Sequence, residues 1–136
     1  MKKTIVIAEA GVNHNGDIRI AKALVDSAAK AGADFIKFQT FKADNLVRKD
    51  TPKSRYQIQD SIELESQYTM LKKLELSESM HLELIAYSKQ RNIEFMSTAF
   101  DIDSVKMLHR FGQKFFKIPS GEITNLPYIR YIGSLR

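Results

Sequence analysis

The sequence predicts an α/β fold of the (β/α)8 TIM-barrel type, with about four β/α units present, a half barrel. Apolar segments of strand length alternate with segments whose apolar residues recur at helical spacing. Polar side chains gather at or just beyond the C-terminal ends of the strands, where barrels collect groups from several strands. An open doubly wound sheet fits less well, because Gly11-Val-Asn-His-Asn-Gly16 lacks the glycine-rich phosphate fingerprint of that fold.

A complete barrel takes roughly 250 residues. We therefore expect residues 1–136 to form the N-terminal part of one barrel domain, with the second half of the barrel absent from this chain.

The first predicted strand covers residues 4–10, and Asp17 is a good N-cap for the helix that follows. That helix is expected to end near Gly32, and the second strand to cover residues 34–40. Between residue 41 and about residue 64 the apolar pattern fades into lysine, aspartate, threonine, proline and serine. Excursions of that length in a compact domain are often functional.

Four helices and two strands continue the alternation. The helices are expected at residues 68–74, after Ser77, and after Asp101 or Asp103. The strands are expected at residues 94–100 and 114–118, and a last helix at residues 127–135.

The composition predicts an ordered cytoplasmic protein. Hydrophobic residues make up 43% and charged residues 27%, which is ordinary for a globular domain. The absence of cysteine excludes a disulfide framework and thiolate chemistry, and fits a reducing compartment. No export signal is predicted, because Glu9 interrupts the first apolar stretch, and no apolar segment approaches the roughly 20 residues of a membrane span.

The net charge of +5 favours anionic partners. The densest basic stretch, residues 48–55, does not combine basic residues with interleaved aromatic residues as nucleic-acid-binding surfaces do, so no nucleic acid binding is expected. Exposed edges at the first and fourth strands favour association, and we expect a homodimer.

Two lysines stand in short apolar and aromatic runs, Lys37 and Lys117. A desolvated ammonium needs an anionic partner or it sheds its proton, so two such lysines suggest an anion site. Gln39 shares a strand face with Lys37. The alternative is that each lysine is satisfied by a neighbouring carboxylate, such as Glu9 or Glu122.

Five motifs, ordered along the chain, resemble the sialic acid synthase family, most closely its bacterial enzymes that make N-acetylneuraminic acid or legionaminic acid. They are Ile7-Ala-Glu-Ala-Gly-Val-Asn-His-Asn-Gly16, Lys37-Phe-Gln-Thr40, Glu65-Ser-Gln-Tyr68, Ser97-Thr-Ala-Phe100 and Lys117-Ile-Pro-Ser-Gly-Glu122. The family usually has Ser-Thr-Pro-Phe where this chain has Ser97-Thr-Ala-Phe100.

The resemblance implies a manganese-dependent barrel that condenses phosphoenolpyruvate with an N-acylated hexosamine. The acceptor would be N-acetylmannosamine, its 6-phosphate or the diamino sugar used for legionaminic acid. The products would be phosphate and a nine-carbon 2-keto acid. The divalent metal, Mn²⁺ or Mg²⁺, would have its ligands outside this chain, and the family's C-terminal antifreeze-like domain is also expected to be absent from it.

The resemblance also implies residue roles. Lys37 and Lys117 would hold the phosphate and carboxylate of phosphoenolpyruvate, with a hydrogen bond from Ser120. Gln39 and Glu122 would orient the open-chain sugar, and Glu9 would move a proton near the reacting carbons. The candidate catalytic residues are thus Glu9 and Glu122, and the candidate substrate-binding residues are Lys37, Gln39, Lys117, Ser120, Asn13 and Ser97.

Several of these residues have a simpler explanation. Glu122 can cap the loop or helix after Gly121, and Asn15 with Gly16 can form a turn with positive φ, leaving Asn13 and His14 as substrate contacts. His14, His81 and His109 form no ligand motif, so no metal ligand is assigned.

Two functional alternatives stay open. One is an aldolase in which a buried lysine forms a Schiff base with a ketone. The other is an inactive truncated fragment that acts only through association.

Overall fold

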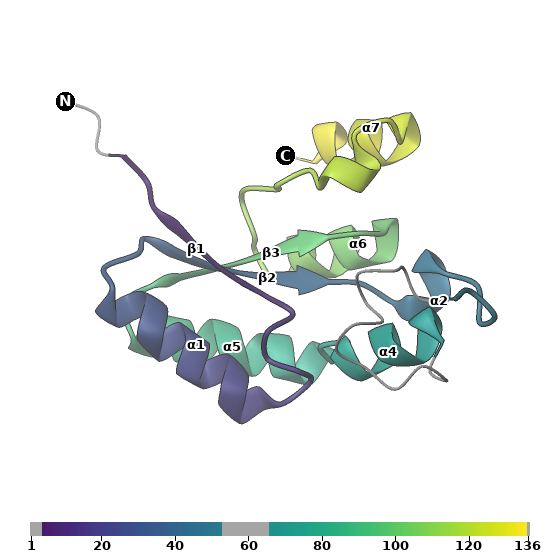
Figure 1. Ribbon diagram of the computed structural model, residues 1–136. Helices are drawn as coiled ribbons and strands as arrows, with labels where there is room; N and C mark the ends of the chain where they lie inside the picture. Colours follow the sequence, from purple (N-terminus) through teal and green to yellow (C-terminus); the bar gives the residue numbers. More distant parts are fainter. Residues whose placement is uncertain (1–3, 53–65, 136) are drawn as a thin grey trace.

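Three parallel strands form the sheet of the computed structural model, which describes residues 4–52 and 66–135 (Figure 1). Their order is β1 (Ile7–Gly11), β2 (Phe35–Thr40) and β3 (Glu94–Ala99). This partial parallel sheet with helices between its strands is consistent with half of a barrel.

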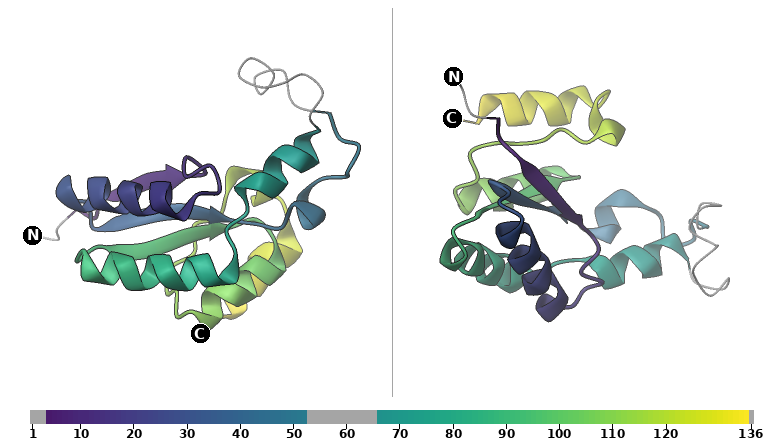
Figure 2. Two further views of the ribbon diagram at one scale, coloured as in Figure 1. Left: turned by 90° about the horizontal axis from the view of Figure 1, so that it is seen from below. Right: turned by 60° about the vertical axis from the view of Figure 1, so that its left-hand side comes forward.

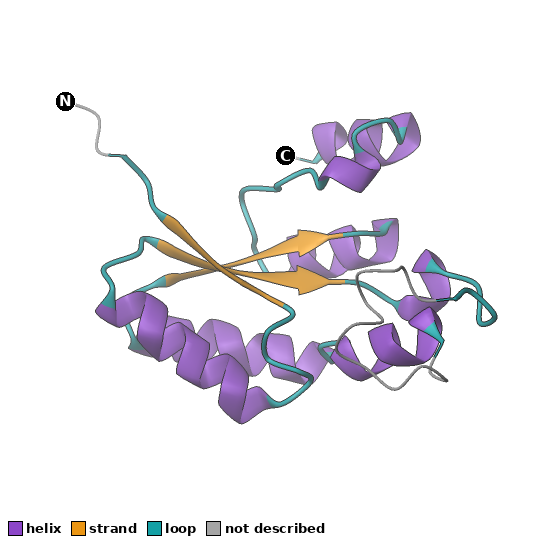
Figure 3. Ribbon diagram, viewed as in Figure 1, coloured by secondary structure: helices purple, strands orange, loops and turns teal. Residues whose placement is uncertain are grey.

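Two helices, α1 (Ile18–Lys30) and α5 (Glu78–Gln90), lie side by side on one face of the sheet (Figures 2 and 3). Both begin at the predicted caps, because the side chains of Asp17 and Ser77 accept hydrogen bonds from the backbone N–H groups of Arg19 and Met80. The core between this layer and the sheet consists of apolar residues. They are Ala10, Ala21, Val25, Ala28, Ile36, Phe38, Leu76, Leu84 and Ile93.

A second apolar cluster holds the C-terminal helices α6 (Ile102–Arg110) and α7 (Leu126–Ser134) to the end of β3. Asp101 rather than Asp103 caps α6, since its carboxylate accepts from the Ser104 N–H at 2.8 Å. The buried Tyr128 of α7 donates its hydroxyl to the Ala99 carbonyl at 2.8 Å. Through this bond α7 is fixed at the carboxyl end of the sheet.

The predicted fourth strand is wrong: residues 114–118 have no strand structure. The reason lies at the edge of β3, where the side-chain amide of Gln113 takes the place of a neighbouring strand. Its Oε1 accepts from the Ser97 N–H at 2.8 Å and its Nε2 donates to the Ser97 carbonyl at 2.9 Å. With these two backbone groups already satisfied, the segment passes from α6 to α7 without pairing (Figure 1).

The long excursion after β2 contains a short helix, α2 (Ala43–Leu46), and α4 (Gln67–Leu74) follows it beside the carboxyl ends of β2 and β3 (Figure 1). The two helices are tied by hydrogen bonds from the Ala43 N–H to Glu75 and from the Tyr68 hydroxyl to Asp44. The rest of the excursion, residues 53–65, lies outside the described residues, and with it Glu65. Within the part described, no helix has the length and apolarity needed to cross a membrane.

The turn before α1 confirms the positive φ expected of Asn15 and Gly16, at 51° and 76°. Gly16 also lies against α4, because a Cβ added there would stand 2.3 Å from the Lys73 carbonyl oxygen. No L residue fits this position without movement of backbone.

We expect Gly16→Ala to lower the free energy of unfolding by roughly 2–5 kcal/mol, the sum of left-handed strain and overpacking. Gly32→Ala is the matched control: its φ is +78°, yet an added Cβ would meet no atom of residues 4–52 and 66–135 within 4 Å. It should lose only the conformational part, about 1–2 kcal/mol. Urea unfolding followed by circular dichroism measures both. Equal losses would mean that the contact with α4 does not constrain Gly16.

Candidate functional site

The candidate site is built around Lys37, which β2 holds between β1 and β3. Its Cα lies opposite Glu9 on one side and Met96 on the other. The residue is only 9% exposed, its ammonium forms an ion pair with the Glu9 carboxylate, and Nζ lies 3.4 Å from Thr98 Oγ1. The predicted buried lysine is confirmed, and so is the carboxylate partner considered as its alternative.

Glu9 is the solvent-accessible member of this ion pair, because its side chain is 52% exposed. Water therefore reaches the carboxylate while the lysine remains covered. An exposed carboxylate can leave its partner at little cost when another anion approaches, since solvent screens the pair. The pair thus presents a covered cation behind a displaceable anion.

Gln39 joins the pair at the end of β2. A bulge between Glu9 and Gly11 shifts the register so that Gly11 lies opposite Phe38. A Cβ on Gly11 would lie 3.4 Å from Glu9 Oε1 and 3.5 Å from Gln39 Nε2. Both polar groups therefore flank this glycine, whose missing side chain leaves room above the backbone.

The placement of Ser97 requires a correction. Its side chain is fully buried on the helix side of the sheet and lies 2.6 Å from the Thr40 hydroxyl, so it does not face the Lys37 side. Side chains alternate along a strand, and the next residue, Thr98, is the one that meets Lys37. Thr98 was missed although it stands within Ser97-Thr-Ala-Phe100, because the motif alone does not say which face each residue takes.

Lys117 also departs from the prediction, since it is exposed rather than buried. Its segment does not join the sheet, so no strand covers its side chain. The described residues therefore hold one covered lysine at the strand ends, not two. Ser120 is likewise exposed, in the short 3-10 helix η1 (Ser120–Glu122).

Glu122 accepts a hydrogen bond from the Asn125 side chain at 2.7 Å, and Asn125 caps α7. This is the local capping role considered as the alternative, and a catalytic role for Glu122 stays a prediction. Glu122 and Asp101 add to the effect of burial, which raises the pKa of Tyr128 to about 12. The phenol therefore stays protonated as the donor to Ala99.

In the loop after β1, Asn13 is exposed and stays a predicted substrate contact. His14 is fully buried instead: its Nδ1 accepts from the Gly16 N–H at 3.0 Å, and its ring lies 6.1 Å from that of Phe38. It faces the core, so it is not a substrate contact in this arrangement.

The residues present do not fit a metal ion by themselves. Among residues 4–52 and 66–135, no three histidine, cysteine or acidic side chains form a group suited to hold one. Glu9, the carboxylate of the candidate site, is already paired with Lys37.

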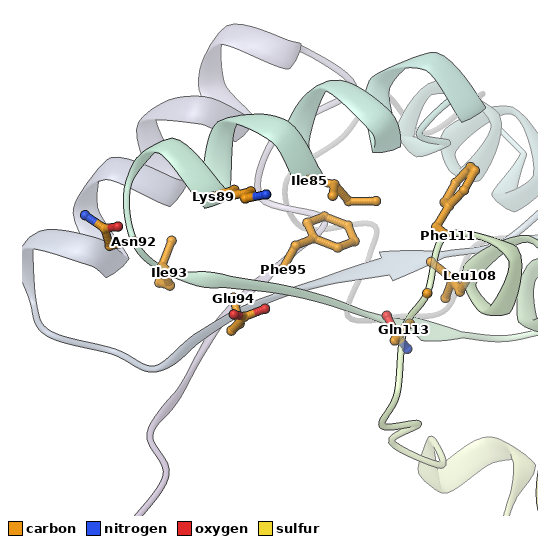
Figure 4. Close-up of a pocket in the computed structure, with 10 residues that line it drawn as sticks. Ile85, Lys89, Asn92, Ile93, Glu94, Phe95, Leu108, Phe111 and Gln113 are labelled. Atoms are coloured by element: carbon orange, nitrogen blue, oxygen red, sulfur yellow. The ribbon is translucent and has the colours of Figure 1, made fainter. Parts of the chain in front are cut away.

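A cavity of about 520 Å³ lies elsewhere, between α5, the start of β3 and the end of α6 (Figure 4). Ile85, Phe95, Leu108 and Phe111 are among its lining residues, and Lys89 and Glu94 stand at its rim. It is lined by none of the candidate site residues. At the Lys37 cluster, Glu9 is exposed to solvent while the lysine is covered.

Known proteins of one family resemble this chain in sequence and in fold. The NeuB family model matches residues 24–136. The chain belongs to the NeuB family. N,N'-diacetyllegionaminic acid synthase of Campylobacter jejuni is 55% identical over 135 residues, covering 99% of this chain and 40% of that protein. The enzyme of the same name from Legionella pneumophila is 54% identical over 129 residues, or 95% of this chain and 36% of that one.

A solved structure agrees with the fold. The N-acetylneuraminic acid synthetase of Leptospira borgpetersenii, crystallised with citrate, superposes with a TM-score of 0.77 at 30% identity, over 95% of this chain and 41% of its own. This NeuB-family chain thus spans about two fifths of the length of the relatives it matches.

Two buried histidines make the stability of the chain pH-dependent. Burial lowers the pKa of His14 and of His81 below the ordinary value of 6.5. Below about pH 6.5 the unfolded chain therefore binds more protons than the folded one, so stability is fully present above that pH and is lost as the pH falls.

We expect a lower urea midpoint at about pH 5.5 than at about pH 7.5, and a smaller difference in His81→Gln. His109→Gln, at an exposed position of α6, should keep the wild-type difference. An equal pH dependence in all three proteins would contradict the assignment.

Proposed function

We propose that this chain supplies the phosphoenolpyruvate-binding part of a nine-carbon sugar acid synthase. The intact enzyme would condense phosphoenolpyruvate with an N-acylated amino sugar and release phosphate. One observation carries the proposal: the covered Lys37 ammonium at the carboxyl edge, with Glu9, Gln39 and Thr98 around it. Family membership supports it.

The charge of phosphoenolpyruvate explains why such a site suits it. Its phosphate and carboxylate carry several negative charges within a small molecule, and a fixed ammonium lowers the cost of burying them. In our proposal the anion takes the place of the Glu9 carboxylate on Lys37, with the Thr98 hydroxyl as a further donor. Lys117 and Ser120 reach it only if their segment approaches the sheet edge.

Displacement of Glu9 would free a base beside the reacting atoms. The enol electrons of phosphoenolpyruvate form a bond from C3 to the aldehyde carbon of the sugar, and the aldehyde oxygen takes up a proton. Water then adds to the cationic C2 and gives a proton to a base, for which Glu9 is our candidate. The tetrahedral intermediate then breaks the bond between C2 and the phosphate oxygen, and its C2 hydroxyl gives its proton to the departing phosphate, leaving the 2-keto acid. Gln39 would orient the sugar, and Glu122 stays a candidate for the same task.

The similarity to two legionaminic acid synthases favours a diamino sugar as the acceptor over N-acetylmannosamine. We also propose a homodimer and a divalent cation, Mn²⁺ or Mg²⁺, with its ligands outside this chain. The residues that the structure describes give no basis for assigning a step to that cation.

We expect Lys37→Met, in a version of the chain carrying a full-length C-terminal continuation, to weaken phosphoenolpyruvate binding roughly 10- to 100-fold through loss of charge-assisted hydrogen bonds. Lys22→Met is the matched control, because Lys22 pairs with Glu83 at 2.6 Å within the helix layer. Phosphate release with each acceptor sugar gives KM and kcat, and the 136-residue chain is assayed in parallel.

Equal effects of the two variants would overturn the anion site. Activity in the extended version together with no activity in the 136-residue chain would identify the 136-residue chain as an inactive fragment. A borohydride-trapped adduct on Lys37 or Lys117 would favour the aldolase, although an ammonium engaged by a carboxylate has no free lone pair for attack.

A further inference from the structure

Three buried polar side chains form a hydrogen-bonded chain on the helix side of the sheet, behind the candidate site. Ser97 Oγ lies 2.6 Å from Thr40 Oγ1, and Thr40 Oγ1 lies 2.7 Å from His81 Nε2. The three residues come from β3, β2 and α5 and are at most 2% exposed. The function proposed above makes no use of them.

The direction of every bond in this chain follows from one carbonyl. His81 Nδ1 lies 2.8 Å from the Ser77 carbonyl oxygen, which can only accept, so Nδ1 carries the proton. In the neutral ring, Nε2 is then an acceptor and receives the Thr40 hydroxyl hydrogen. The Thr40 oxygen in turn accepts from Ser97.

The residues of this hydrogen-bonded chain are direct neighbours of the site residues on β2 and β3. Thr40 follows Gln39 on β2, and Ser97 precedes Thr98 on β3, where Gln39 and Thr98 lie directly opposite one another. Because side chains alternate, the hydrogen-bonded chain occupies one face while Gln39, Thr98 and Lys37 occupy the other. Hydrogen bonds that hold Thr40 and Ser97 in place therefore also fix the backbone that determines the positions of Gln39 and Thr98.

We propose that Thr40 and His81 are positioning residues for the anion site: the hydrogen bond that neutral His81 accepts from Thr40 holds the ends of β2 and β3 so that Thr98 and Gln39 meet the substrate, and its reversal on protonation of His81 disturbs that arrangement. This inference rests on the proposed function for its substrate, but its structural part can be measured without one.

Protonation of His81 reverses the direction of the hydrogen bonds in this chain. The imidazolium has hydrogens on both nitrogens, so Nε2 donates to Thr40 Oγ1, Thr40 donates to Ser97 Oγ, and the Ser97 hydroxyl hydrogen loses its acceptor. Burial lowers the pKa of His81; the Ser77 carbonyl and Glu78 oppose the shift, and Lys42 reinforces it. The other groups facing this region are the His14 imidazole, whose charge interacts with His81, Arg110, which pairs with Glu78, and the rings of Phe95 and Phe111.

The first test is a pH titration of the unmodified chain by NMR. The amide resonances of Gln39 and Thr98 should shift with the midpoint of the His81 ring, and the ring nitrogens should report the Nδ1–H tautomer above it. In Thr40→Val the amide shifts should lose that midpoint. Amide resonances that do not shift with the His81 titration, or that shift with it equally in Thr40→Val, would overturn the proposal.

The second test is phosphoenolpyruvate affinity, with the C-terminal continuation present. Thr40→Val should weaken binding roughly tenfold, while Thr40→Ser, which keeps the hydroxyl, should stay within about twofold of the wild type. Ser88→Ala is the matched control, because Ser88 Oγ is a buried hydroxyl of α5 that has no hydrogen-bond partner among the described residues. Lowering the pH through the His81 midpoint should weaken binding in the wild type more than in Thr40→Val.

The outcomes separate the two proposals. Wild-type binding with equal affinities in Thr40→Val and Ser88→Ala would overturn the positioning role and leave the proposed function standing. Absence of phosphoenolpyruvate binding in the wild type, with amide shifts that follow His81, would reject the function while supporting the coupling of His81 to the strand ends.

Discussion

Alternation of side chains along β2 is the constraint on which the rest of this molecule depends. Ile36 and Phe38 face the helices and are buried in the core, while Lys37 and Gln39 face the opposite side. A shift of one residue would place an ammonium in the apolar layer and a phenylalanine at the site. The apolar layer under α1 and α5 therefore also fixes the orientation of the site.

The ion pair of Lys37 with Glu9 shows how one covered charge is kept at low cost. The lysine is surrounded by strands on both sides, and its partner reaches water. A pair buried on both sides would cost more desolvation and would resist exchange with a substrate anion. A half-open pair can serve folding and ligand exchange with the same two residues.

The edge of β3 illustrates a different principle. The Gln113 amide copies the hydrogen-bonding pattern of a peptide group and satisfies both polar groups of Ser97. It thereby protects part of a sheet edge that would otherwise be open to pairing. Residues 114–118 have a strand-like sequence but form no strand, because the Gln113 side chain occupies this edge of β3. Strand propensity and periodicity do not take such a side-chain contact into account.

The sequence by itself determined the first three strands and the helices between them, the caps at Asp17 and Ser77 and the covered Lys37, because these follow from local periodicity and from burial of an apolar run. Only the tertiary structure decided which residues meet: Thr98 rather than Ser97 at Lys37, an exposed Lys117, and His81 behind the site. The physical reason is that strand register and the partner of a sheet edge depend on residues far apart in the chain. No local pattern records them.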